Sequence, residues 1–187
     1  VQKGIERGYK KEFLRPSVVK DPLTRSRPRY APCITHIAIV PGGKIKLTLL
    51  PKGFGCENKS QLKMFNPTAT QDAIKDFIIQ AVKEAGPNAC PPYVIGVGIG
   101  GTADHASFLA KKALLRKLGA SSSRGATAKL EKELLQAVNK LSIGPMGLGG
   151  NTTALGVHVN TYPTHIAGLP VAVNISCHAL RSATVTL

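Results

Sequence analysis

Apolar residues recur every three or four positions in three stretches of the chain, and this spacing predicts three helices. The first helix follows Thr70 and Asp72 and stops at Gly86-Pro87. The second follows the turn GGTAD and stops at Gly119, and the third begins near Leu130. The inner stripes of the three helices are Ile74, Phe77, Ile78, Ala81 and Val82; Ala106, Leu109, Ala110, Ala113 and Leu114; and Leu130, Leu134, Leu135, Val138 and Leu141.

A shorter helical pattern lies at the amino end of the chain. Ile5, Tyr9, Phe13 and Leu14 stand at near-helical spacing among Lys and Glu residues. This predicts a short helix that ends before Pro16, because proline has no N–H to donate within a helix.

Other stretches have the pattern of strands. The continuous apolar runs YVIGVGI, TALGVHV and LPVAVNI are typical of buried strands. CITHIAIV and KIKLTLL alternate apolar and polar residues and are joined by PGG, which predicts an antiparallel hairpin. The segment PKGFGCENKS after them is predicted to be a glycine-rich loop.

This order of elements predicts an α+β fold, a mixed sheet flanked by helices, with α/β as the alternative. A chain of 187 residues that is 43% hydrophobic can bury a real core as one domain or two small lobes. We expect a single domain over residues 1–187. No apolar run is long enough to cross a membrane, and no hydrophobic block follows the basic amino end. We therefore expect a soluble cytoplasmic protein without a membrane partner.

The formal net charge of +15 raises the question of a nucleic-acid partner. Aromatic residues make up only 5% of the chain, and neither a stacking platform nor zinc-finger spacing is visible. A solvated basic face, an anionic substrate or an acidic partner subunit explains the charge better, so we expect no nucleic-acid function.

The four cysteines stand far apart and form no CxxC pair, and the chain is not the short, cysteine-dense kind that disulfides stabilise. Cys90 and Cys177 each adjoin an apolar run in a polar, glycine-rich context. These two are candidate metal ligands. Cys33, inside CITHIAIV, is interpreted as a small buried hydrophobe.

Two further features have both a structural and a functional interpretation. The glycine turn GVGIGG could present backbone N–H groups to an anion, or could let a strand pack closely against its helix. His165 lies in a turn twelve positions before Cys177, where an imidazole could orient or protonate a substrate. For a histidine without other context, a structural role is the more common one.

Several motifs together resemble a known family. They are CPPYVIGVGIGGTADH, GPMGLGGNTTALGVHV, PTHIAGLPVAVNISC and GFGCENKS, which occur in order along nearly the whole chain. They are similar to the alpha subunit, or amino-terminal catalytic region, of the iron–sulfur hydro-lyases, the class I fumarate hydratases and L-tartrate dehydratases. The resemblance implies reversible hydration of fumarate to L-malate, or dehydration of tartrate, by an oligomer in which a beta subunit supplies the base.

The resemblance also implies a cofactor and its ligands. The family holds a 4Fe-4S cluster with three cysteines and leaves one iron open to act as a Lewis acid. Cys90 and Cys177 match two of these ligands. The third belongs to a CQDTG motif that this chain does not contain, so we expect the chain to lack its amino-terminal segment. A non-catalytic assembly domain is the alternative.

Substrate contacts are implied at three positions. Arg15, in GYKKEFLRPS, matches an arginine that grips a substrate carboxylate, which suits a bidentate guanidinium. Gly55 matches a glycine whose N–H meets the dicarboxylate substrate, and His165 matches a substrate-contacting histidine; Arg15 and His165 are the expected catalytic residues.

The chain departs from the family pattern in three places. It has SRPRYAP for NTGDNTP, GFGCEN for GGGSEN, and GPMGLGG for GPQGLGG. The second change puts Phe54 and Cys56 beside the expected substrate loop, where Phe54 could obstruct a dicarboxylate.

Overall fold

The computed structural model describes residues 1–187, which divide into two compact units, 1–44 and 45–187. No helix in the chain is both long and apolar enough to span a membrane. Each unit is described by itself below.

The first unit is built on the predicted short helix, which is confirmed as α1 (Gln2–Lys11). No residue of α1 is buried. The Gln2 side chain holds the backbone of Cys33, donating to its carbonyl oxygen at 2.9 Å and accepting from its N–H at 2.7 Å. An isolated bridge between Val18 and Arg29 closes the intervening segment. This unit is therefore held by polar contacts more than by a core.

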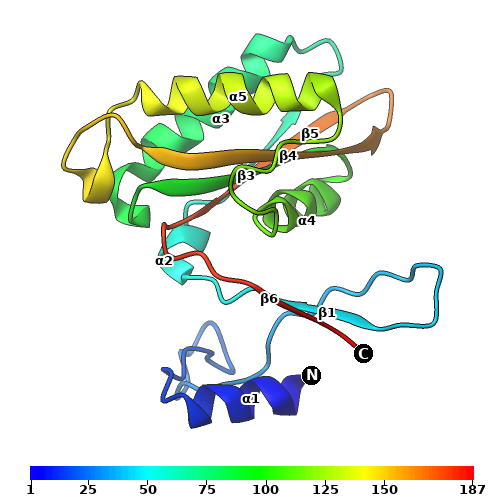
Figure 1. The fold of residues 1–187 in the computed structure, drawn as a ribbon, viewed down its shortest axis with the longest axis vertical. Coiled ribbons are helices and arrows are strands. Elements are labelled where there is room, and N and C mark those ends of the chain that lie inside the picture. Colours follow the sequence, from blue (N-terminus) through cyan, green and yellow to red (C-terminus); the bar gives the residue numbers. More distant parts are fainter. The chain divides into compact units, whose positions relative to one another are not determined.

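The second unit contains a mixed four-stranded sheet in the order β2-β5-β3-β4 (Figure 1). β3 (Tyr93–Gly101) and β4 (Ala154–Thr164) run parallel, whereas β5 (Leu169–Ser176) is antiparallel to both β3 and β2 (Gln61–Phe65). The predicted α+β class with a mixed sheet is confirmed. The three predicted buried strands are β3, β4 and β5, and β2 is a strand that the sequence pattern did not indicate.

Helices cover both faces of this sheet (Figure 1). α3 (Gln71–Ala85) and α5 (Gly125–Asn139) pack on one face over the large core, and α4 (Ala103–Ala113) packs on the other. The Thr70 hydroxyl caps α3 by accepting from the Ala73 N–H at 3.2 Å. All three predicted helices are confirmed, although α4 ends well before Gly119.

The glycines of the GVGIGG run allow α4 to approach β3 closely. A Cβ on Gly96 would lie 2.1 Å from the Ala110 carbonyl oxygen, and one on Gly98 would lie 2.0 Å from that of Ala106. No side chain fits at either position, so close packing of strand against helix explains these two glycines.

The predicted hairpin between residues 33–40 and 44–50 is wrong. β1 (Lys46–Leu49) pairs instead with β6 (Ala183–Thr186), and CITHIAIV forms no strand. The Thr48 and Thr184 hydroxyls lie 3.0 Å apart across this ribbon. Both strands are largely exposed, so no buried face dictates which segment pairs with which.

Short helical turns complete the second unit. α2 (Phe54–Glu57) is a single turn inside the segment predicted to be a loop. Two 3-10 turns, η1 (Gly86–Ala89) and η2 (Pro145–Gly147), precede β3 and β4. η1 ends at Cys90, and α2 contacts both η1 and β5, which brings these turns to one end of the sheet.

Candidate functional site

Cys90 and Cys177 lie at the same end of the sheet. Val94 of β3 pairs with Ser176 of β5; Cys90 precedes Val94 by four residues, and Cys177 directly follows Ser176. The imidazole Nδ1 of His178 is 3.3 Å from the Cys90 carbonyl oxygen, so the two segments touch. Antiparallel pairing thus unites two cysteines 87 positions apart in the sequence. We call this region the thiol end.

The two thiols differ in their access to solvent. Cys90 is exposed, whereas Cys177 is half-buried against the main core. Cys90 also has a φ of 53°, in the left-handed region that non-glycine residues seldom adopt. Such backbone strain is concentrated at functional sites in proteins. The thiol end therefore has one sulfur open to solvent and one packed against the core.

A third cysteine lies at the thiol end, where sequence reasoning did not select it. Cys56 of α2 is 4% exposed, and its Sγ donates to the Ala89 carbonyl oxygen at 3.2 Å. Burial raises the pKa of the Cys56 thiol, and the charge of nearby Cys177 raises it further. Cys56 therefore favours the neutral thiol. Cys33, predicted to be buried, is only half-buried and belongs to the first unit.

Tyr93, the first residue of β3, brings a buried hydroxyl to this end. Its side chain is fully buried, and its hydroxyl has no hydrogen-bond partner. Burial, with smaller contributions from the charges of Cys56 and Cys90, raises the pKa of Tyr93 to about 12. Sequence reasoning counted Tyr93 only as part of an apolar strand.

A polar cluster fixes α2 against β5, and we call it the Glu57 network (Lys52, Glu57, Ser60, Lys111 and Asn174). Lys52 donates to the Ile175 carbonyl oxygen at 2.6 Å, and its Nζ lies 3.3 Å from the Glu57 carboxylate. The Asn174 amide donates to Glu57 at 3.2 Å and to the Ser60 hydroxyl at 2.8 Å. Through these bonds, the turn that carries Gly55 and Cys56 is held in place.

The charges of the Glu57 network influence one another. Burial alone would raise the pKa of Glu57, but hydrogen bonds from Lys111 and Asn174 outweigh it, so the pKa lies below its ordinary value. Burial lowers the pKa of Lys52, and Glu57 partly opposes this effect. The carboxylate is therefore ionised at neutral pH and ties two lysines to α2.

Of the other predicted site residues, Gly55 lies in α2 next to Cys56, and His165 lies at the opposite end of β5. His165 is exposed in the turn between β4 and β5, where its Nδ1 accepts from the Ala167 N–H at 3.2 Å. That turn adjoins the start of β5, whereas Cys177 follows its end, and an extended strand of eight residues is about 26 Å long. Arg15 belongs to the first unit and is exposed. The roles of Arg15, Gly55 and His165 stay predictions.

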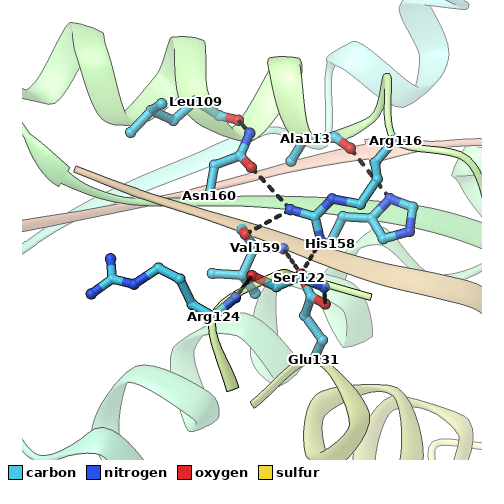
Figure 2. A network of polar contacts seen from close by, with 9 residues as sticks. All are labelled: Leu109, Ala113, Arg116, Ser122, Arg124, Glu131, His158, Val159 and Asn160. Carbon is cyan, nitrogen blue, oxygen red and sulfur yellow. Dashed lines mark hydrogen bonds and ion pairs between the residues drawn. The ribbon is translucent and has the colours of Figure 1, made fainter. Parts of the chain in front are cut away.

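A second carboxylate cluster lies on β4, and we call it the Glu131 network (Arg116, Ser122, Glu131, Val159 and Asn160; Figure 2). Glu131 accepts from Arg116, from the Val159 N–H at 2.7 Å and from the Ser122 N–H at 2.9 Å. Arg116 also donates to the Val159 carbonyl oxygen and to the Asn160 side chain, each at 3.0 Å. Beside it, buried His158 places its Nδ1 3.2 Å from the Ala113 carbonyl oxygen, in keeping with a packing role.

The thiol end fits part of the ligand set of an iron–sulfur group. Two cysteines that share one end of a sheet, one of them exposed, have the donor chemistry that such a group requires. The unpaired Tyr93 hydroxyl is a buried donor beside them. No three His, Cys, Asp or Glu side chains of residues 1–187 are grouped so as to hold a metal ion. The chain alone therefore offers two expected ligands and not a complete set.

Comparison with known proteins places this architecture in a family. The family model described as fumarate hydratase (Fumerase) matches residues 1–186. The chain belongs to the fumarate hydratase family, as its motifs predicted.

Individual relatives carry more particular names. A Methanocaldococcus jannaschii protein, provisionally named L(+)-tartrate dehydratase subunit alpha, is 43% identical over 194 residues, covering 98% of this chain and 66% of that protein. The L(+)-tartrate dehydratase subunits alpha of Escherichia coli and Shigella sonnei are each 32% identical over 153 residues, covering 82% of this chain and 50% of theirs. The chain thus spans between half and two thirds of the length of these relatives.

Proposed function

We propose that this chain is the alpha-type part of an iron–sulfur hydro-lyase that adds water to, or removes it from, a small dicarboxylate. The observation that carries the proposal is the meeting of Cys90 and Cys177 at one end of the β3–β5 pair. Membership of the fumarate hydratase family supports the reaction class.

In this proposal Cys90 and Cys177 hold a 4Fe-4S cluster together with a third thiolate from outside residues 1–187. When bound, such a cluster supplies a Lewis acid for the substrate hydroxyl and carboxylate. Cys56 is not counted among its ligands, because it does not match the ligand motifs of the family and its thiol donates to the Ala89 carbonyl oxygen.

The residues of the chain bind and orient the substrate. Arg15 binds a substrate carboxylate through its guanidinium. The N–H of Gly55, in the turn fixed by the Glu57 network, donates to the substrate. Within one chain His165 lies at the opposite end of β5 from Cys177, so in this proposal His165 reaches the substrate from a second copy in an oligomer. The net charge of +15 attracts the dicarboxylate over a distance.

A partner completes the proposed enzyme. The relatives are named as alpha subunits, which supports a separate beta subunit that contributes the base. We propose a cytoplasmic location for the assembly. Hydration of fumarate to L-malate is the first candidate reaction, and the names of the relatives favour dehydration of L-tartrate as the second.

The test is anaerobic reconstitution, with ferrous iron and sulfide, of the protein together with the segment that supplies the third thiolate, followed by measurement of bound iron and acid-labile sulfide. We expect the wild-type chain to retain iron, and Cys90→Ser or Cys177→Ser to abolish retention, because each removes a thiolate ligand. Cys33→Ser is the matched control, because Cys33 is a free cysteine that is not an expected ligand, and it should leave iron binding unchanged.

Turnover is then measured with the beta-type partner added, using fumarate and L-tartrate side by side. The faster reaction identifies the substrate. Equal iron retention by wild type, Cys90→Ser and Cys177→Ser would contradict the proposal, as would turnover that survives either substitution.

A further inference from the structure

The Tyr93 hydroxyl is a polar group at the thiol end without a partner inside the chain. The Tyr93 side chain is fully buried, and its backbone N–H donates to the Thr153 carbonyl oxygen at 2.8 Å. Only the hydroxyl lacks a hydrogen bond. Leaving a buried donor unsatisfied destabilises the folded state, so buried hydroxyls nearly always have a partner. An orphaned one beside candidate ligands points to a partner that binds there.

The sheet register sets Tyr93 beside the thiols. Successive residues of a strand point to opposite faces, so Tyr93 shares a face with Ile95, and Cys177 shares the same face with Ile175. Because Val94 pairs with Ser176, continuing the register makes Tyr93 and Cys177 cross-strand neighbours. Cys56 belongs to the same apolar cluster.

We propose that the Tyr93 hydroxyl donates a hydrogen bond to the sulfur atoms of the iron–sulfur group held by Cys90 and Cys177, and so slows the loss of that group. This inference rests on the proposed function. In this proposal Tyr93 stabilises the bound group through a hydrogen bond to its sulfur, and it does not touch the substrate. Partners of this kind around metal ligands are commonly worth 10- to 100-fold in metal affinity, by order of magnitude.

A purely structural role for the hydroxyl predicts a different pattern. If the hydroxyl is only an unsatisfied group in the core, its removal changes the stability of the iron-free and the iron-loaded chain by the same amount. If it donates to the cofactor, its removal leaves the iron-free chain as stable as before, or more stable, and weakens only the loaded one. The two roles are therefore separated by comparing both forms.

The experiment uses Tyr93→Phe, which removes the hydroxyl and keeps the ring, in the protein that includes the segment supplying the third thiolate. Tyr162→Phe is the matched control, because Tyr162 is 56% exposed and lies near the far end of β4. Each variant is loaded anaerobically with ferrous iron and sulfide, and the release of iron to a chelator is timed. Thermal unfolding of the iron-free and the loaded forms is measured in parallel.

We expect Tyr93→Phe to release iron about tenfold faster than wild type or more. Its iron-free form should unfold at the same or a higher temperature, and Tyr162→Phe should match wild type in both measurements. Unchanged release by Tyr93→Phe overturns the inference and leaves the proposed function standing. Equal destabilisation of the iron-free and loaded forms also overturns it. If the wild-type protein takes up no iron even with the third thiolate present, the proposed cluster and this inference fail together.

Discussion

The Glu131 and Glu57 networks solve the same physical problem at two places on one sheet. β4 is an edge strand, and the Glu131 network satisfies both the N–H and the carbonyl of Val159 with side chains where a further strand would otherwise pair (Figure 2). β2 reaches β5 only as far as Val173, and beyond it Lys52 bonds the Ile175 carbonyl. On β4 a carboxylate and a guanidinium take the place of strand pairing, whereas on β5 the Lys52 ammonium does so, with Glu57 as its counter-ion.

The networks differ in how completely their polar groups are paired. Glu131 is 6% exposed and accepts three donors, which is close to the full capacity of a carboxylate. In the Glu57 network, the buried side-chain amide oxygen Oδ1 of Asn174 has no hydrogen-bond partner. Glu57 itself is more exposed, and its helical turn carries Gly55 and Cys56. The fully paired network serves stability, whereas the incompletely paired one adjoins the thiol end and its candidate chemistry.

The largest expected effect on stability comes from a substitution in the Glu131 network. Glu131→Ala leaves Arg116 without its buried counter-ion and the Val159 N–H without an acceptor, so we expect a loss of about 3 kcal/mol in the free energy of unfolding. Urea denaturation measures it. Glu133→Ala, on the same helix but with a side chain 36% exposed, is the control and should change far less. Equal losses in the two variants would show that burial of Glu131 is not the cause.

Glu57→Gln should destabilise the protein less than Glu131→Ala does, but it should make the Cys56 thiol at the thiol end more accessible. The substitution keeps the shape of the side chain but removes the charge that holds Lys52 and Lys111, so we expect a loss of about 1 kcal/mol. Loosening of α2 should also speed alkylation of Cys56 in the native state, as measured by peptide mass spectrometry.

Two internal comparisons sharpen that result. The exposed Cys90 thiol should be alkylated at the same rate in wild type and Glu57→Gln. Glu131→Ala, tested where it remains folded, should leave Cys56 as protected as in wild type. Faster alkylation of Cys56 in Glu131→Ala would mean that the two networks are coupled through the sheet.

Much of the second unit could be predicted from the sequence because burial imposes a period. α3, α4 and α5 each have a one-sided apolar stripe, and β3, β4 and β5 are buried on both faces. The β1–β6 ribbon has no buried face, so proximity in the sequence suggested the wrong partner for residues 44–50. β2 was missed because its burial pattern is mostly exposed.

The site was predictable only in part, for physical reasons of the same kind. Cys90 and Cys177 could be singled out by their flanking runs, but their meeting depends on the antiparallel register of β3 and β5. Tyr93 was counted as an apolar residue, because nothing in its neighbours shows that its hydroxyl is unpaired. Twelve positions separate His165 from Cys177, yet the intervening strand is extended and carries them to opposite ends of the sheet.

The smallest expected effect is the response of stability to acid, in which His158, beside the Glu131 network, and Glu57 act in different pH ranges. Burial lowers the pKa of His158 and the nearby charge of Arg116 lowers it further, while Glu131 partly opposes them. The unfolded chain therefore binds a proton at His158 more readily than the folded chain, and stability falls as the pH drops below about 6.5.

Glu57 acts at lower pH, because its pKa in the folded chain is lowered. The stability that ionised Glu57 contributes persists until the pH drops below about 4.5, and it is lost as the pH falls through the folded pKa. Unfolding free energies measured from pH 7 down to about pH 3 cover both declines. The decline caused by His158 should amount to a fraction of about 1.4 kcal/mol per pH unit, the value for one whole proton. His158→Asn keeps a donor near the Ala113 carbonyl and should flatten this decline, whereas Glu57→Gln should flatten only the lower one; a His158→Asn profile parallel to wild type above pH 5 would remove His158 as its cause.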